Sequence, residues 1–349
     1  NHQQLANGRE VLNLVGTGME RLTLAGKGSL FGDSGIVNFG KKVSFATDAE
    51  NGVSDLGSKV GFRAVGKEIE QLSAVKATHV IFDSFESLEV VHDVAAVNDG
   101  YVDARVYKDG ADILYSSDIL SSKDNDFDGD GSGWIRLVSP DGKISNESEN
   151  RTWAKDGHLI LRAKDGIGSI SDPIRSNVAE LTASNALHGT GDIVLLETDS
   201  INLRKEGPGA VRSNPGYLIP DNLEVEPVWV EESSWIAELS ADWRNQFVNG
   251  NDLHAVAAGS GLIDLRLVQA ESLLALSSGN IIARVASKPI TLQADDYEFL
   301  SGAEQLIGTG LLTIDTISNP IAFRLGTAAE DKLGEKIHLP QSVDLSSED

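Results

Sequence analysis

The 349-residue sequence contains no cysteine, only 9 prolines, and few aromatic residues, which make up 6% of the chain. The absence of cysteine excludes a disulfide scaffold of the kind that stabilises small secreted domains, whereas a long repeat protein needs none. No run of about 18 apolar residues occurs, so the sequence predicts no membrane-spanning helix. The scarcity of bulky rings favours a narrow interior filled by aliphatic side chains.

Basic residues are also scarce, since 29 Lys and Arg stand against 53 Asp and Glu, for a net charge of −24. This balance argues against a nucleic-acid partner, because phosphate contacts need a basic face. An acidic surface suits solubility, calcium-rich surroundings or a cationic partner. Plain solvation of a large surface is the alternative interpretation.

What the sequence does contain is a short apolar pattern that recurs along most of its length. Each occurrence is flanked by Gly, Asp, Asn or Ser, and such short strands cannot build a sandwich core alone. They can stack, with each strand covering the next, into a β-solenoid. The absence of tight Asn-Gly hairpins between them favours parallel stacking. The pattern is found at Leu22–Leu24, Leu159–Leu161, Ile193–Leu195, Ile201–Leu203, Ile281–Ala283, Ile290–Leu292 and Leu312–Ile314.

The rhythm of these strands divides the chain into four parts. We expect solenoid coils over 1–204 and 259–327, an inserted region over 205–258, and a polar linker or tail over 328–349. Within the coils, side chains should alternate between the two faces of a strand, as in the run Val102–Val106, where Asp103 and Arg105 face outward. No initiator Met or apolar leader opens the chain, so we expect a segment of a longer protein.

The expected insertion interrupts the strand pattern with prolines and tryptophans. One stretch has apolar residues at helical spacing, which indicates one short helix, with irregular strands as the alternative. Exposed tryptophans can stack on sugar rings or anchor a protein contact, whereas buried ones would cover the flank of the solenoid. The candidate contact residues are Trp229, Trp235 and Trp243.

An acidic segment carries the strongest local motif for a metal ion. Carboxylates occur at alternate positions and Gly129 follows the third, as at the start of a calcium-binding loop. The twelfth position is Ile135, where such loops place a bidentate Glu, so a solvated acidic turn is the alternative. The candidate ligands of a Ca²⁺ ion are Asp124, Asp126, Asp128 and Asp130.

Catalytic motifs are missing from the sequence. There is no G-x-S-x-G elbow and no phosphate-binding P-loop, and the 7 histidines show no metal-ligand spacing. The run Gly157–Leu159 lacks the second Gly of the Gly-His-Gly motif of polygalacturonases. The sequence therefore predicts a non-enzymatic protein.

Several of the expected coils share a sequence pattern in which Gly and Asp precede aliphatic triplets. These coils resemble those of filamentous-haemagglutinin-like large bacterial exoproteins. The resemblance covers about half of the chain clearly and the N-terminal third weakly, and the segment 205–258 departs from it. It is carried by Gly131–Leu137, Gly157–Ala163, Asp165–Ser169, Leu181–Ala183, Gly191–Leu195, Gly279–Ile282, Ile290–Ala294 and Gly308–Ile314.

The resemblance implies an all-β fold, a right-handed parallel β-helix with the irregular Trp-rich insertion. It further implies a structural or adhesive segment of a large secreted or surface-anchored bacterial protein, located outside the cell and flanked by further repeats. Its loops would contact a glycan or protein of a cell surface or matrix. The alternative is a carbohydrate-active enzyme or a glycan-binding module on the same scaffold, which a groove lined by carboxylates and tryptophans would favour.

Overall fold

The structure is a computed structural model of the whole chain. It describes residues 2–4, 10–14, 21–24, 35–39, 43–47, 53–55, 62–66, 69–71, 74–84, 86–106, 108–124, 126–147, 150–185, 189–205, 254–283, 285, 288–299, 306–308 and 311–318. Within these ranges the chain forms strands and turns and no helix, and therefore no helix that could cross a membrane. The expected all-β fold of many short strands is confirmed.

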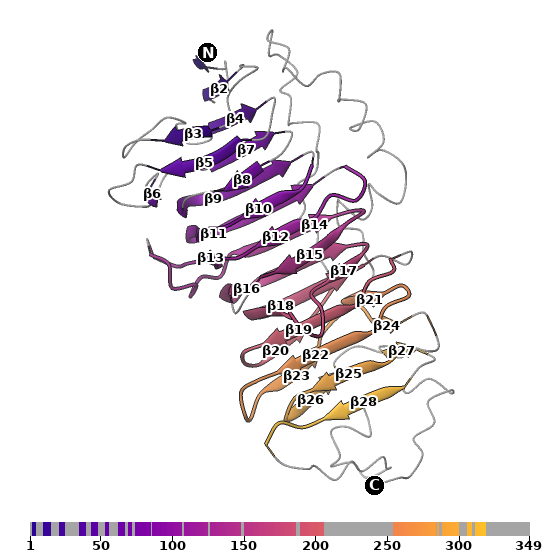
Figure 1. Cartoon of the computed structure of the whole chain (residues 1–349). Coiled ribbons are helices and arrows are strands. Elements are labelled where there is room, and N and C mark those ends of the chain that lie inside the picture. Colours follow the sequence, from indigo (N-terminus) through magenta and orange to yellow (C-terminus); the bar gives the residue numbers. More distant parts are fainter. Residues whose placement is uncertain are drawn as a thin grey trace, which may run out of the picture.

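The strands stack one above another along the molecule (Figure 1). Almost all of their pairings are parallel, and most of the strands belong to three ladders, named A, B and C here. Ladder A contains β2 (Glu10–Leu14), β4 (Gly35–Phe39), β7 (Phe62–Gly66), the second halves of β9 (Ala74–Ser84) and β11 (Val94–Val106), β14 (Trp134–Ser139), the second halves of β16 (Arg151–Ala163) and β18 (Ile174–Ser184), β21 (Val256–Ala258), β24 (Ile281–Ala283) and β27 (Leu306–Gly308).

Ladder B contains strands of two to five residues. Its members are β3 (Arg21–Leu24), β5 (Val43–Thr47), β8 (Ile69–Gln71), β10 (Leu88–Val90), β12 (Ile113–Tyr115), β15 (Lys143–Asn146), β17 (Gly166–Ile167), β19 (Ile193–Glu197), β22 (Ile263–Leu267), β25 (Ile290–Gln293) and β28 (Leu312–Asp315).

Ladder C completes the set and uses the first halves of the long strands. It contains β6 (Val53–Asp55), the first halves of β9 and β11, β13 (Ile119–Ser121) and the first halves of β16 and β18. Beside the second half of β18, a further short ladder contains β20 (Ile201–Leu203), β23 (Leu273–Leu276) and β26 (Asp296–Phe299).

One pairing among the described strands is antiparallel, and parallel stacking alone did not predict it. It joins β1 (His2–Gln4) to β2 at the N-terminal end of the stack. Only residues 5–9 separate these two strands, and so short a connection permits a hairpin but no parallel crossover.

Two described strands lie near the boundaries expected from the sequence. β20 (Ile201–Leu203) ends before residue 205, where the insertion is expected to begin. The next described strand, β21 (Val256–Ala258), lies inside the range expected to be an insertion. Residues 206–253, with the expected short helix, and residues 328–349 lie outside the described residues.

The core is a column of aliphatic side chains that the parallel register holds in line. On ladder B, a series of aliphatic residues extends from strand to strand, and each residue of the series is the direct register partner of the next. All are buried, and burying one such side chain stabilises the fold by about 1.5–3 kcal/mol. The column runs through Ile113, Ile144, Ile167, Ile193, Ile263, Ile290 and Leu312.

Polar side chains in the connections between strands add hydrogen bonds from one connection to the next. Asp93 accepts a hydrogen bond from the backbone N–H of Asp118 at 3.1 Å, and Asp118 accepts one from the N–H of Arg151 at 2.9 Å. Elsewhere, a Cβ atom at Gly157 would collide with the carbonyl oxygen of Gly133. The Asp and Gly residues that punctuate the sequence therefore hold the turns in close contact.

The alternation expected in β11 is confirmed, with an unexpected feature on its outward face. Val102 and Ala104 lie in the core, and Asp103 and Arg105 lie on the opposite face, yet all four are buried. The Arg105 guanidinium donates two hydrogen bonds to the Asp103 carboxylate, at 3.0 and 3.1 Å. Because the two opposite charges are paired and hydrogen-bonded, the pairing offsets part of the cost of removing each of them from water.

Glu197, at the end of β19, is a buried carboxyl group. It accepts hydrogen bonds from the Ser176 hydroxyl at 2.5 Å and from the N–H groups of Thr198 at 2.9 Å and Val178 at 3.2 Å. Burial raises the pKa of Glu197 to about 8 and outweighs the opposite effect of these hydrogen bonds. The folded protein therefore keeps this carboxyl protonated at neutral pH.

This burial predicts a pH dependence of stability. Between the ordinary pKa of 4.5 and about 8, the folded state holds a proton that the unfolded chain releases, so the unfolding free energy falls as pH rises through this window. We expect Glu197→Gln to remove roughly 3–5 kcal/mol of that fall, measured by urea denaturation at a series of pH values. The control is Glu147→Gln at an exposed carboxylate, and an unchanged pH slope in Glu197→Gln would contradict the assignment.

Candidate functional site

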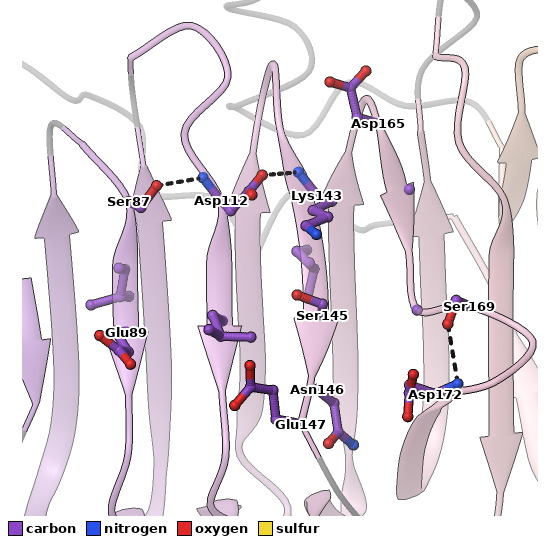
Figure 2. Close-up of a pocket in the computed structure, with 15 residues that line it drawn as sticks. Ser87, Glu89, Asp112, Lys143, Ser145, Asn146, Glu147, Asp165, Ser169 and Asp172 are labelled. Carbon is purple, nitrogen blue, oxygen red and sulfur yellow. Dashed lines mark hydrogen bonds between the residues drawn. The ribbon is translucent and has the colours of Figure 1, made fainter.

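A groove of about 510 Å³ lies on the outward face of ladder B. It crosses β10, β12, β15 and β17, with their strands running side by side beneath it (Figure 2). It is lined by Ser87, Leu88, Glu89, Asp112, Leu114, Lys143, Ile144, Ser145, Asn146, Glu147, Asp165, Gly166, Gly168, Ser169 and Asp172.

The floor of the groove follows from strand alternation and parallel register. Because Leu88 and Val90 point into the core, the residue between them, Glu89, points outward. Glu89 is the register partner of Leu114, and Leu114 is the register partner of Ser145. A carboxylate, an aliphatic side chain and a hydroxyl thus form a row across three strands, each of them half-buried.

One rim of the groove lies where β10, β12 and β15 begin. Its side chains form hydrogen bonds with the backbone at the start of the neighbouring strand. The Ser87 hydroxyl accepts a hydrogen bond from the N–H of Asp112 at 3.0 Å, and Asp112 accepts one from the N–H of Lys143 at 2.8 Å (Figure 2). Asp112 is therefore a structural residue of this rim, although its charge still contributes to the groove.

The opposite rim lies at the ends of the same strands and contains Asn146, Glu147, Ser169 and Asp172. Asn146 is 3% exposed, and its amide nitrogen donates a hydrogen bond to the carbonyl oxygen of Asn150 at 2.9 Å. Its buried Oδ1 has no hydrogen-bond partner among the residues that the structure describes. Asn146 is the register partner of the core residue Tyr115, so its side chain lies on the inward face of β15 and this acceptor is not exposed to the groove.

The groove carries an excess of negative charge. Five carboxylates line it, against the single ammonium group of Lys143. Within the described part of the chain, no side chain pairs with Lys143 or with the carboxylates of Glu89 and Glu147, so these groups are available to a ligand. The five acidic residues are Glu89, Asp112, Glu147, Asp165 and Asp172.

The described lining of the groove contains none of the predicted tryptophan contacts. Trp229, Trp235 and Trp243 lie outside the described residues, and the residues that line the groove include no tryptophan. Among the described tryptophans, Trp134 stacks on Tyr101, with ring centres 4.3 Å apart.

The acidic segment predicted to bind calcium covers an apolar patch on ladder C. Phe127 and Trp153 pack against a small cluster formed by Ala95, Val97 and Leu120. The loop backbone is tied to the strands beneath it, as in the hydrogen bond from the N–H of Gly131 to the carbonyl oxygen of Ser121 at 2.8 Å. Phe127 therefore acts as a hydrophobic anchor for the loop.

The carboxylates of this loop are partly engaged with its own backbone. Asp130 accepts a hydrogen bond from the N–H of Lys123 at 2.9 Å, and Asp128 accepts one from the N–H of Asp130 at 3.2 Å. The pKa of Asp126 is raised by partial removal from water and by its hydrogen bond with Asp128. Within the described ranges, no group of three or more acidic or histidine side chains lies close enough together to hold a metal ion. This holds for Asp124 as for the other aspartates of the loop.

His158, which the sequence places in the Gly157–Leu159 run, is a buried residue of ladder A. Its Nε2 lies 2.8 Å from the hydroxyl oxygen of Thr182. Burial, together with the positive charges of Arg204 and Arg162, lowers the pKa of His158 to about 3. This histidine is therefore neutral near pH 7 and is a satisfied structural side chain.

No protein family, curated protein or solved structure matches this chain. The resemblance to exoprotein coils therefore rests on the sequence motifs alone, and the function has to be argued from the groove and the ladders.

The sequence did not point to the groove, although a weak signal for it exists. The strands that form the floor share the pattern of a polar residue, an aliphatic residue and an outward residue, at 87–89, 112–114 and 143–145. These triplets are far apart and unevenly spaced in the chain. Only the register of ladder B shows that their outward residues are neighbours.

The calcium interpretation of the acidic loop stays a prediction. It expects heat to be released or absorbed on titration of the protein with Ca²⁺, and expects an Asp126→Ala/Asp128→Ala variant to lose that signal in isothermal titration calorimetry. The matched control is Asp156→Asn, at an exposed carboxylate outside the loop. Identical heats for the wild-type protein and the loop variant would remove the metal from the account.

Proposed function

We propose that ladders A, B and C are the three faces of a right-handed parallel β-helix. In chain order, β14 belongs to ladder A, β15 to ladder B and the first half of β16 to ladder C, and the second half of β16 returns to ladder A beside β14. Such a repeated circuit supports the proposal. The right hand is the one that parallel crossover connections adopt almost without exception.

The proposed role is that of a structural and adhesive segment of a large secreted or surface-anchored bacterial protein. The resemblance to exoprotein coils supports this role, as does the absence of cysteine from a long stack of strands. The segment would lie at the outer surface of the cell or beyond it, within a longer array of repeats. Its partner would be a glycan or protein of a cell surface or matrix.

The observation that carries this proposal is the groove on ladder B. A stack of parallel strands repeats its outward positions at the strand spacing, about 4.8 Å, and so offers an extended ligand a row of contacts. Glu89, Leu114 and Ser145 form such a row, and rigid pairing in the ladder holds them before the ligand arrives. Trp229, Trp235 and Trp243 remain proposed as further contact residues.

The second candidate function is that of a carbohydrate-active enzyme, and the carboxylates of the groove favour it. Glycoside hydrolysis needs two acidic side chains on either side of the scissile bond. Glu89 and Glu147 are the two groove carboxylates without a partner among the described residues, and they are the candidates for that pair. A Ca²⁺ ion, if the acidic loop holds one, would support either function by fixing a loop at the side of the stack.

Binding to a glycan array tests the proposed function. We expect reproducible binding by the wild-type chain and its loss in Glu89→Gln/Glu147→Gln, because these substitutions keep the shape of the groove and remove its available charges. Loss of binding in Trp229→Ala, Trp235→Ala or Trp243→Ala would extend the site to the tryptophans. The control, Asp156→Asn/Glu271→Gln, removes two exposed carboxylates elsewhere and should bind as the wild type does.

Two outcomes of this experiment would decide against adhesion. Absence of binding to every glycan would contradict a glycan-contacting role for the groove. Appearance of new reducing ends or unsaturated sugars in polysaccharides incubated with the wild type, but not with Glu89→Gln/Glu147→Gln, would replace adhesion with catalysis.

A further inference from the structure

We propose that the groove on ladder B selects glycans that carry free amines, such as oligomers of glucosamine, over neutral and uronic-acid glycans. The proposal rests on the proposed function, since it names the class of glycan for the same groove. It is argued from the charge of the groove, from its excess of hydrogen-bond acceptors and from the pairing of its strands.

The charge of the lining favours a cationic ligand. Five carboxylates face the groove or stand on its rims, and Lys143 supplies the single positive charge among the lining residues. A uronic acid would place a further carboxylate among them and be repelled, whereas a protonated amine would be attracted. The net charge of −24 acts in the same direction at longer range, because it attracts cations to the surface of the protein.

The acceptor groups of the groove also lack hydrogen-bond donors among the described side chains. The carboxylates of Glu89 and Glu147 accept a hydrogen bond from no described side chain. A ligand that complements them has to donate hydrogen bonds. An ammonium group donates three and makes the stronger, charge-assisted kind with a carboxylate.

Two features of the groove favour a sugar over a basic peptide. The floor combines the aliphatic side chain of Leu114 with the Ser145 hydroxyl and the Glu89 carboxylate, which suits a ring with an apolar face and polar edges. The strands beneath it are paired on both sides: β10 with β8 and β12, and β15 with β12 and β17. A peptide therefore finds no free strand edge to extend here.

The experiment compares three tetrasaccharides by isothermal titration calorimetry at a mildly acidic pH, where the sugar amine is protonated. These are the tetramers of glucosamine, N-acetylglucosamine and galacturonic acid. We expect the glucosamine tetramer to bind at least about tenfold more tightly than the acetylated one, with an affinity that falls as salt is added, and the uronate to bind most weakly.

Variants of the full chain locate the effect. Glu89→Gln/Glu147→Gln should weaken the glucosamine tetramer at least about tenfold and leave the acetylated tetramer nearly unchanged, since it removes charge and keeps shape. Lys143→Gln should strengthen glucosamine binding by removing a like charge. The matched control, Asp156→Asn/Glu271→Gln, changes the net charge as much as the double groove variant and should behave as the wild type.

The outcomes separate this proposal from the one on which it rests. Equal affinity for the glucosamine and acetylated tetramers would overturn the selection of amines and leave the glycan-binding function standing. Absence of binding by all three, together with an empty glycan array, would overturn both. Equal or tighter binding of a tetralysine peptide, lost in Glu89→Gln/Glu147→Gln, would show that charge alone is recognised and would overturn the assignment of a sugar.

Discussion

The structure depends on the parallel register between successive strands. Because parallel pairing sets the inward residue of one strand beside the inward residue of its partner, aliphatic side chains line up across the ladder, as Ile144 does with Ile167 and Ile167 with Ile193. The same register aligns the connections between strands, where Asp118 accepts a hydrogen bond from the backbone N–H of Arg151. Short strands that would be unstable alone thereby gain backbone hydrogen bonds on two sides and a continuous apolar column. Insertions can enter at the corners without disturbing it, and the acidic loop anchored by Phe127 is one example.

The groove is a consequence of the same register. Alternation turns every second side chain outward, and parallel pairing sets the outward residues of neighbouring strands in rows. Where a row contains Glu89, Leu114 and Ser145, and the rims carry further carboxylates, the surface becomes an acidic groove. The residues that make it stable and those available to bind are distinct. Ser87 and Asp112 hold the corner, whereas Glu89 and Glu147 have no partner among the described side chains.

The sequence predicted the part of the fold that depends on local patterns. Triplets such as Ile290–Leu292 are strands, and the polar residues around them form turns, because alternation and turn chemistry act over a few residues. Burial that depends on distant neighbours could not be read in this way. Arg105 alternates as an outward residue yet is fully buried beside Asp103, and Glu197 is enclosed by hydrogen-bond donors from another strand. Phe127, an apolar residue among aspartates, is the feature of the sequence that indicates packing of the acidic loop on an apolar patch. The groove needs the register between residues separated by that loop, which no local pattern supplies.

The most direct test of the parallel register uses the absence of native cysteine. Thr291 and Thr313 are register partners on β25 and β28, and cysteines at directly opposed positions of paired strands fall within the range of Cα separations that a disulfide requires. We predict that Thr291→Cys/Thr313→Cys forms an intramolecular disulfide rapidly under mild oxidation, quantified by mass spectrometry of proteolytic fragments. Thr291→Cys/Asp315→Cys, two residues out of register, should form it far more slowly. Equal rates for the two pairs, or faster closure of the out-of-register pair, would contradict the stacking on which the column, the corners and the groove all depend.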